Sequence, residues 1–190
     1  TIKAFFNSDS ARVAVEAHGK AKLVTATNVF AHMEDVHAVV ENILAMLSAD
    51  GIFVSESHYL LPLIETLQYD TVYHEHLRYY SLTSLRALLS VHGLDVIHAS
   101  RIPTHGGSIR VFAARRGQYS PTAEPARLLS IESKQLDHDS LLNFAGRVAA
   151  SKLALLALLW LTGRVLVLTP FGWAAAIVNA AFPIAAAVGL

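Results

Sequence analysis

The chain of 190 residues contains no cysteine, which excludes disulfide bonds and zinc sites built from thiolates. It also lacks both G-x-G-x-x-G and G-x-x-x-x-G-K-[ST], so neither of these glycine-rich nucleotide-binding loops is present. Basic and acidic residues balance at 15 each, and this zero net charge argues against a nucleic-acid partner. The absence of cysteine fits a reducing compartment, and we expect a cytoplasmic location.

Charged residues are scarce at the C-terminal end, where Arg164 is the only one between Leu153 and Leu190. The stretch 165–190 is long enough to cross a bilayer, but two prolines and an asparagine interrupt it. Two interpretations stay open. The stretch is either a membrane span or the apolar, degenerate start of a second α/β domain.

Apolar and polar residues before this tail predict alternating strands and helices. The first half predicts a helix ending at Gly19, a buried strand over Lys22–Thr27, a helix capped by Asp35 and stopped by Asp50-Gly51, and a strand over Ile52–Glu56. An irregular insert over Ser57–Tyr80 follows, with one short helix around Leu60–Leu67. Such alternation is typical of an α/β sheet.

The second half predicts a helix over Leu82–Val91, with Thr83 as its cap and Gly93 as its stop. Two strands follow, at Leu94–Ser100 and Ser108–Ala114, and the Gly-Gly turn between them predicts an antiparallel hairpin. After a polar linker, one long helix is expected from about Ala126 to Trp160. We therefore divide the chain into an α/β part (1–117), a linker with a long helix (118–162) and an apolar tail (163–190).

The segment Tyr73-His74-Glu75-His76 concentrates proton-handling groups. A neutral imidazole is a usable base at neutral pH, and a neighbouring carboxylate can orient it and stabilise its cation. A phenol or second imidazole can donate to an oxygen on which charge develops. His74 and His76 could share a metal only with further ligands, and no third ligand is obvious, so we expect no metal.

Four stretches together resemble the sugar-nucleotide C-methyltransferases, which use S-adenosylmethionine. They are Asn28-Val29-Phe30-Ala31-His32; Phe53-Val54-Ser55-Glu56 with Tyr59-Leu60; Tyr73-His74-Glu75-His76-Leu77 with Tyr80-Ser81-Leu82; and His105-Gly106-Gly107-Ser108-Ile109-Arg110. The resemblance covers about residues 1–155.

This resemblance implies a class I methyltransferase (Rossmann-like) fold, of which the predicted strands would be the C-terminal half with its antiparallel edge hairpin. It implies that a base removes a proton next to a sugar ketone and that the enolate carbon then takes the methyl group. By resemblance the base is His76, with Glu75 and Tyr73 lining the site and His32 opposite. The turn Asn28-Val29-Phe30 would pass the cofactor, and His105, Gly106 and Gly107 would contact the nucleotide sugar.

The sequence departs from this family in three places. The glycine-rich cofactor loop and the cysteine-rich zinc module of the family are missing, and Thr169-Pro170-Phe171-Gly172 replaces a glycine-rich turn of its second α/β unit. Two alternatives to an active enzyme therefore remain: an inactive truncated remnant or interaction module, and a protein anchored to a membrane through residues 165–190. The sequence predicts no oligomeric state.

Simpler interpretations of single residues also stay open. His32 could cap a helix or lie in the core, His105 could only shape a turn, and Arg110 could be an ion-pair partner rather than an anion contact. The other histidines are expected to be solvated and are given no role; they are His18, His37, His58, His92, His98 and His138.

Overall fold

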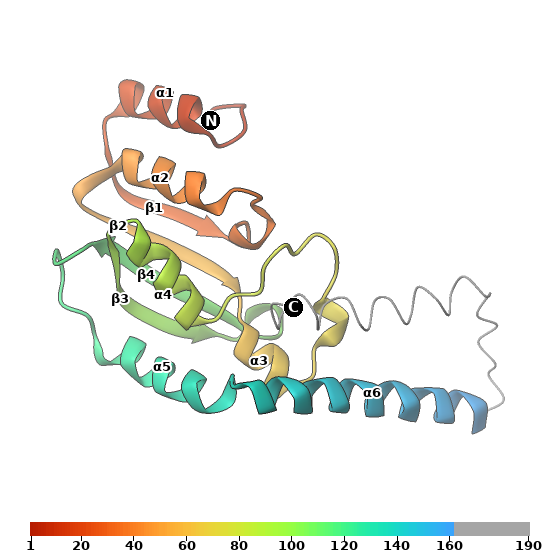
Figure 1. Cartoon of the computed structure of the whole chain (residues 1–190). Helices are drawn as coiled ribbons and strands as arrows, with labels where there is room; N and C mark the ends of the chain where they lie inside the picture. The colour runs from red at the N-terminus through yellow and green to blue at the C-terminus, as the bar shows by residue number, and fades with distance from the viewer. Residues whose placement is uncertain (162–190) are drawn as a thin grey trace.

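A four-stranded sheet is the centre of the structure, a computed structural model that describes residues 1–161 (Figure 1). The strand order is β1-β2-β4-β3. β1 pairs parallel with β2, whereas β2–β4 and β4–β3 are antiparallel. The strands are β1 (Ala21–Thr27), β2 (Leu47–His58), β3 (Leu94–Ile102) and β4 (Ser108–Arg115). The predicted α/β class and the antiparallel hairpin are confirmed.

Helices α1 (Ser8–His18), α2 (Val36–Met46) and α4 (Leu82–Val91) begin at side-chain caps. Asp35 accepts a hydrogen bond from the backbone N–H of Ala38 at 3.0 Å, so the predicted cap of α2 is confirmed. For α4 the predicted bounds Leu82–Val91 are confirmed, but the predicted cap is wrong by two residues. Its cap is Ser81, which has an extended backbone and accepts from the N–H of Ser84 at 3.0 Å.

β2 begins earlier than the sequence predicts. The helix expected to run to Asp50-Gly51 ends at Met46, and the strand starts at the next residue, Leu47, which is fully buried. Gly51 lies inside the strand, where a Cβ atom would come within 2.7 Å of the Leu47 side chain. The pairing of β1 with β2 is irregular next to this glycine. The pair Asp-Gly therefore marks an irregularity in a strand and not the end of a helix.

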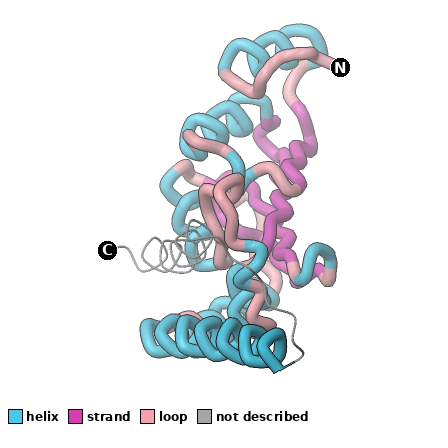
Figure 2. Tube along the Cα trace, turned by 90° about the vertical axis from the view of Figure 1, so that its right-hand side faces the viewer, coloured by secondary structure: helices cyan, strands magenta, loops and turns pink. Residues whose placement is uncertain are grey.

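The core lies between the sheet and α2 and α4, and Figure 2 shows most of the helices on one side of the strands. Each helix contributes residues at three- and four-residue spacing, as in Leu82, Leu85 and Leu89 of α4, which are fully buried. Burying each such side chain stabilises the fold by about 1.5–3 kcal/mol. The same packing fixes the short helix α3 (Leu60–Glu65), which leads into the irregular insert.

The single long helix predicted from Ala126 to Trp160 is in fact two helices, α5 (Ala123–Gln135) and α6 (His138–Leu161). The break follows from Asp137, whose carboxylate accepts from the backbone N–H of Ser140 at 2.8 Å. That bond satisfies a donor in the first turn of α6 and so favours a new helix start over a continuous helix.

Glu132 of α5 holds that helix against the rest of the fold. Its carboxylate is 2% exposed and accepts hydrogen bonds from the Tyr59 hydroxyl at 2.8 Å, from the backbone N–H groups of Leu82 and Thr83, and from the Thr83 hydroxyl at 2.6 Å. Thr83, predicted as the cap of α4, donates to Glu132 instead. Burial raises the pKa of Tyr59, and its bond to Glu132 adds to this effect.

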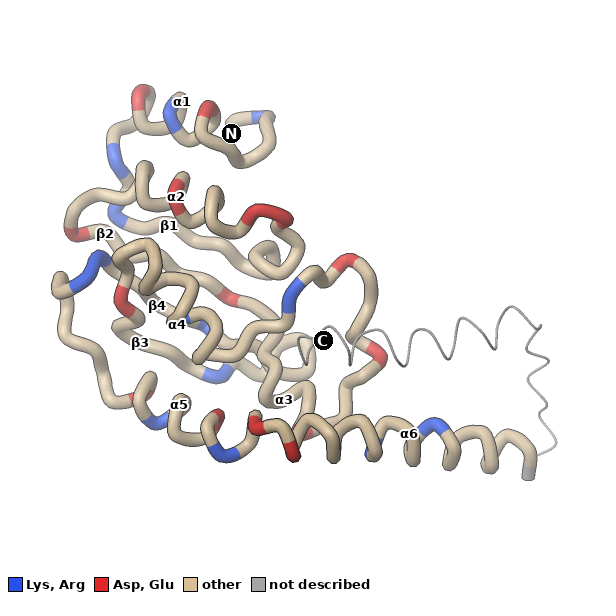
Figure 3. The backbone as a smooth tube through the Cα atoms, viewed as in Figure 1, with Lys and Arg blue, Asp and Glu red and all other residues tan. Residues whose placement is uncertain are grey.

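α6 continues past α3, away from the sheet (Figure 1), and carries few charged residues (Figure 3). Within His138–Trp160 a window of 18 residues has a mean hydropathy of 1.4, with 6% of that window buried, and the helix is long and apolar enough to cross a membrane by length and composition. Leu153 is 66% exposed and Trp160 is 76% exposed. The predicted span 165–190 lies outside the described residues.

Replacing Glu132 by glutamine should lower the free energy of unfolding by about 1–3 kcal/mol, because the new amide NH₂ would face the donors of α4 or Tyr59. Urea unfolding followed by circular dichroism measures the change. The control is Glu124→Gln, which removes an exposed ion pair with Arg127 in the same helix and should leave the midpoint unchanged. Equal midpoints for both variants would contradict the role of Glu132.

Candidate active site at the carboxyl ends of the parallel strands

The predicted site residues gather at one edge of the sheet. β1 and β2 run parallel, so their carboxyl ends lie together, and the N–H of Asn28 donates to the carbonyl of Glu56 at 2.8 Å there. The turn between β3 and β4 reaches the same edge, because His58 at the end of β2 pairs with Ser108 at the start of β4. Open α/β sheets bind their ligands at such an edge.

The turn after β1 separates the three residues predicted to bind the cofactor. Asn28 has a left-handed backbone (φ 54°), and Asn28 and Val29 are exposed. The ring of Phe30 is buried in the core, where it packs 5.7 Å from Phe53 and 6.0 Å from Tyr80. Of these three residues, only Asn28 and Val29 therefore present side chains at the surface.

The segment 73–78 is held to the turn 28–34 by backbone contacts. The N–H of Leu77 donates to the carbonyl of Ala31 at 3.0 Å, and Arg78 donates to the carbonyls of Met33 and Glu34. His32 Nδ1 lies 2.8 Å from the carbonyl of Glu75. Because a carbonyl only accepts, this contact requires a proton on Nδ1 of His32.

This arrangement brings two of the predicted catalytic histidines together, with the rings of His32 and His76 4.9 Å apart. The Tyr73 hydroxyl lies 3.3 Å from His76 Nε2, and the two rings are 4.5 Å apart. Tyr79 packs edge-on against His76 at 5.6 Å. His76 Nδ1 is buried and has no hydrogen-bond partner among residues 1–161. The nitrogen that Tyr73 contacts, Nε2, is therefore the one available for chemistry.

Burial lowers the pKa of His76, and the nearby imidazoles of His32 and His58 lower it further. The backbone of Thr71 and the charge of Glu75 raise this pKa, but their effects are smaller. The lowered pKa keeps the ring neutral near pH 7, which is the state that a general base needs.

The predicted role of Glu75 has a different geometric basis. Its side chain is exposed, and no hydrogen bond joins its carboxylate to His76 in the described part of the chain. Its backbone carbonyl contacts His32 instead. Glu75 thus positions His32 through its backbone and acts on His76 only through its charge.

The turn His105-Gly106-Gly107 requires both of its glycines. Gly106 has φ +77° and Gly107 has φ +126°, and the added Cβ atoms would lie 2.4 Å from Gln68 Oε1 and 2.6 Å from Pro62 Cβ. His105 is exposed and itself has a left-handed backbone (φ 52°). The turn is shaped by close packing on the insert, and His105 is its exposed side chain at the site edge.

Two residues of this edge were missed by the sequence analysis. His58, expected to be solvated, is half-buried, with its ring 6.3 Å from that of His76 and its Nε2 3.2 Å from Gln68 Oε1. Gln68 also donates to the carbonyl of Gly106 at 2.7 Å. The position of His58 at the end of a strand, two residues after Glu56, was the signal that could have found it.

Some polar side chains make structural contacts away from these two histidines. Arg110 pairs with the buried carboxylate of Glu56 at 2.6 Å, so the ion-pair interpretation is confirmed. His37 and His92, expected to be solvated, contact each other at 2.8 Å between α2 and α4. Neither contact involves the histidines 32 and 76.

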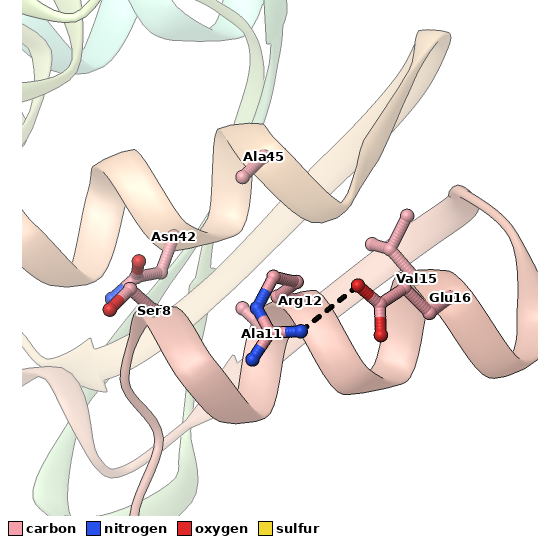
Figure 4. A pocket seen from close by; sticks show the side chains of 7 residues that line it. All are labelled: Ser8, Ala11, Arg12, Val15, Glu16, Asn42 and Ala45. Atoms are coloured by element: carbon pink, nitrogen blue, oxygen red, sulfur yellow. Dashed lines mark hydrogen bonds and ion pairs between the residues drawn. The ribbon is translucent and has the colours of Figure 1, made fainter.

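A hollow between α1 and α2 is separate from this edge (Figure 4). Its polar lining includes Arg12 and Glu16, which pair with each other at 3.0 Å, and Asn42. Within residues 1–161 no group of three or more histidine, cysteine or acidic side chains could hold a metal ion.

The family model described as a methyltransferase domain matches residues 2–99. Among curated proteins, the C-methyltransferase NovU of Streptomyces niveus is 43% identical over 114 residues, which is 60% of this chain and 27% of NovU. The match thus spans about a quarter of the length of that relative.

Solved structures of methyltransferases are similar to parts of the chain. The magnesium protoporphyrin IX methyltransferase of Synechocystis has 15% identity and a TM-score of 0.40, over 50% of this chain and 45% of that one. The mitomycin 7-O-methyltransferase has 18% identity and a TM-score of 0.43, over 57% of this chain and 39% of that one.

The replacement His32→Asn should raise the pKa of His76, because it removes an imidazole that disfavours the His76 cation. NMR titration of the ring protons measures this pKa. His18→Asn in α1 is the control and should leave it unchanged. The lowered pKa of His76 also makes stability depend on pH. In the unfolded chain this histidine takes up a proton at its ordinary pKa of about 6.5, before the folded chain does. The free energy of unfolding therefore decreases as the pH falls from about 6.5 toward the pKa of His76 in the folded chain. An unchanged or lower pKa in His32→Asn would contradict the coupling.

Proposed function

Since the chain belongs to the methyltransferase-domain family, we propose that it takes part in transfer of a methyl group from S-adenosylmethionine to a carbon atom of a keto-sugar nucleotide. NovU, a C-methyltransferase by name, is 43% identical to this chain over 114 residues, which supports carbon as the acceptor. The nucleotide sugar follows from the resemblance of the motifs at residues 28–32, 73–77 and 105–110.

The observation that carries this proposal is the environment of His76. Its ring is partly buried, has a lowered pKa and lies beside a tyrosine hydroxyl and a second histidine. A hydrogen next to a ketone is weakly acidic, and a neutral imidazole that is kept from protonation by its surroundings can accept it. His76 Nε2 accepts the proton from the carbon atom in this mechanism.

The enolate oxygen left by this step carries developing negative charge and needs a hydrogen-bond donor. The Tyr73 hydroxyl and the His32 ring, both within 5 Å of the His76 ring, are the donors that the site offers. His32 is protonated on Nδ1, which is occupied by the Glu75 carbonyl, so only a doubly protonated ring offers Nε2 as a donor. Tyr73 donates in either state of His32.

The sequence encodes residues for one side of the proposed cofactor site. Asn28 and Val29 are exposed at the tip of β1, where a left-handed residue turns the chain across the strand ends. These residues would line the cofactor, while the glycine-rich strand–turn–helix that faces them in dinucleotide-binding sheets is absent from the sequence. When bound, the sulfonium supplies an activated methyl group to the enolate carbon.

Two other functions have support from particular observations. β1 pairs on one side only in the described sheet, as expected of a remnant or interaction module that requires a partner strand. The apolar, exposed end of α6 favours attachment to a membrane. Each alternative predicts a different outcome from the enzyme proposal.

Proton abstraction can be measured without the cofactor. With a keto-sugar nucleotide in deuterium oxide, the chain should exchange the hydrogen next to the ketone for deuterium, detected by mass spectrometry. His76→Asn should slow this exchange by about 10²–10⁴-fold, the usual value of a general base. His74→Asn, in the same exposed segment, is the control and should retain the rate.

A folded wild-type chain that exchanges no hydrogen would overturn the role of His76. Titration calorimetry with S-adenosylmethionine separates this result from the state of the cofactor site. Heat of binding that persists in His76→Asn agrees with the enzyme proposal. No heat at millimolar cofactor indicates the remnant.

If α6 attaches the protein to membranes, the chain should float with vesicles of phosphatidylcholine and phosphatidylglycerol in a density gradient. The double variant Leu153→Glu/Leu155→Glu should lose flotation, because charged side chains are costly in the hydrocarbon region. The matched control Ser130→Glu/Ser133→Glu adds the same charge to exposed positions of α5 and should still float. A wild-type chain that stays at the bottom of the gradient excludes attachment.

A further inference from the structure

Gln68 joins three parts of the site edge. Its side chain contacts Thr66 in its own segment, Gly106 in the turn between β3 and β4, and His58 at the end of β2. The added Cβ of an alanine at 106 would come within 2.4 Å of its Oε1, so the glycine leaves room for this amide. The side chain is half-buried.

The identity of the two amide atoms of Gln68 follows from their neighbours. The carbonyl of Gly106 can only accept, so the amide atom 2.7 Å away must be the NH₂ group. The Thr66 hydroxyl donates its one hydrogen to the carbonyl of Pro62 at 2.8 Å, so it accepts from the same NH₂ group. Both contacts place the oxygen, Oε1, toward His58.

This assignment determines the protonation of the His58 ring. Oε1 is an acceptor, so His58 Nε2, at 3.2 Å, must carry the hydrogen. In the neutral ring the other nitrogen, Nδ1, then holds the lone pair. We propose that Gln68 is a positioning residue that fixes His58 as the Nε2–H tautomer and makes its Nδ1 a second hydrogen-bond acceptor beside His76.

A second acceptor at this place suits a substrate with a hydroxyl group near the reacting carbon. The His58 ring is 6.3 Å from the His76 ring, a separation at which two groups can contact neighbouring atoms of one small molecule. His76 would take the proton from carbon while His58 Nδ1 accepts a hydrogen bond from a hydroxyl of the same substrate. This use of His58 rests on the proposed function, whereas the tautomer itself does not.

The tautomer is measurable in the free chain with ¹⁵N-labelled histidine and long-range ¹H–¹⁵N correlation spectra, at a pH where His58 is neutral. Its signals are assigned by their loss in His58→Asn. The wild-type ring should show the hydrogen on Nε2. In Gln68→Met, which keeps the length of the side chain but has only a weakly accepting sulfur in place of the amide, the signals should move toward a mixture of both tautomers.

Two further variants separate positioning from mere packing. Gln68→Glu retains an oxygen toward His58 and should keep the Nε2–H form, although it loses the bond to Gly106. Gln118→Met changes an exposed glutamine of the turn after β4 and should leave the His58 signals unmoved. Circular dichroism verifies that each variant is folded.

A wild-type ring that carries its hydrogen on Nδ1 would overturn the inference, as would spectra that are identical in Gln68→Met. Equal shifts in Gln68→Glu and Gln68→Met would likewise reduce Gln68 to a packing residue. Because none of these spectra requires substrate or cofactor, the result is independent of the deuterium exchange that tests His76.

Discussion

The site depends on the backbone contacts that hold the segment 73–78 against the turn after β1. One N–H to carbonyl bond from Leu77 to Ala31, two bonds from Arg78 and the contact of His32 with Glu75 fix two irregular segments to each other. Neither segment is part of the sheet, and a loop with unpaired backbone groups would otherwise stay in water. With these bonds in place, the rings of His32 and Tyr73 each come within 5 Å of the His76 ring.

The sheet in turn gives this assembly a fixed position. The parallel pairing of β1 with β2 brings the ends of both strands to one edge, and the antiparallel return of β4 adds the His-Gly-Gly turn. Behind the edge, Glu132 joins α5 to the start of α4 and to Tyr59, one residue after His58. The polar groups at this edge therefore rest on buried contacts made by residues behind it.

Much of this arrangement could be predicted from the sequence because it follows local rules. The spacing of apolar residues located α2 and α4, Asp35 marked a helix start, and the Gly-Gly turn indicated the hairpin. Predictions were wrong where a distant partner decides the outcome. Thr83 is not the cap of α4, since Glu132, 49 residues away, takes its hydroxyl. Asp50-Gly51 resembles a helix stop, but the residues on either side, Leu47 and Ile52, pair with β1, so the strand runs through it.

The site itself was predicted in part. Tyr73, His76 and His32 lie together as the motifs indicated, whereas Phe30 is a core residue and Glu75 contacts His32 through its backbone carbonyl. His58 and Gln68 were missed because their importance comes from a contact across ten residues and a second contact across 38 residues. No short pattern in the sequence encodes such a contact. The same is true of the break before α6, although Asp137 followed by Ser140 is a readable cap.

The bonds that build the site join residues far apart in the chain, and this affects how the protein folds. They join residues 43 to 50 positions apart. Closing loops of that size costs entropy before any contact compensates for it, whereas the helices form from neighbours and the hairpin of β3 and β4 closes over a few residues. By this argument we expect the histidine cluster to assemble after the helices and the β3–β4 hairpin, as does the pairing of β2 with β4, whose partners lie at least as far apart in the chain. Because most of the segment 73–77 is exposed and lies outside the helices and strands, we expect amide hydrogens near His76 to exchange with solvent sooner than those of the central strands.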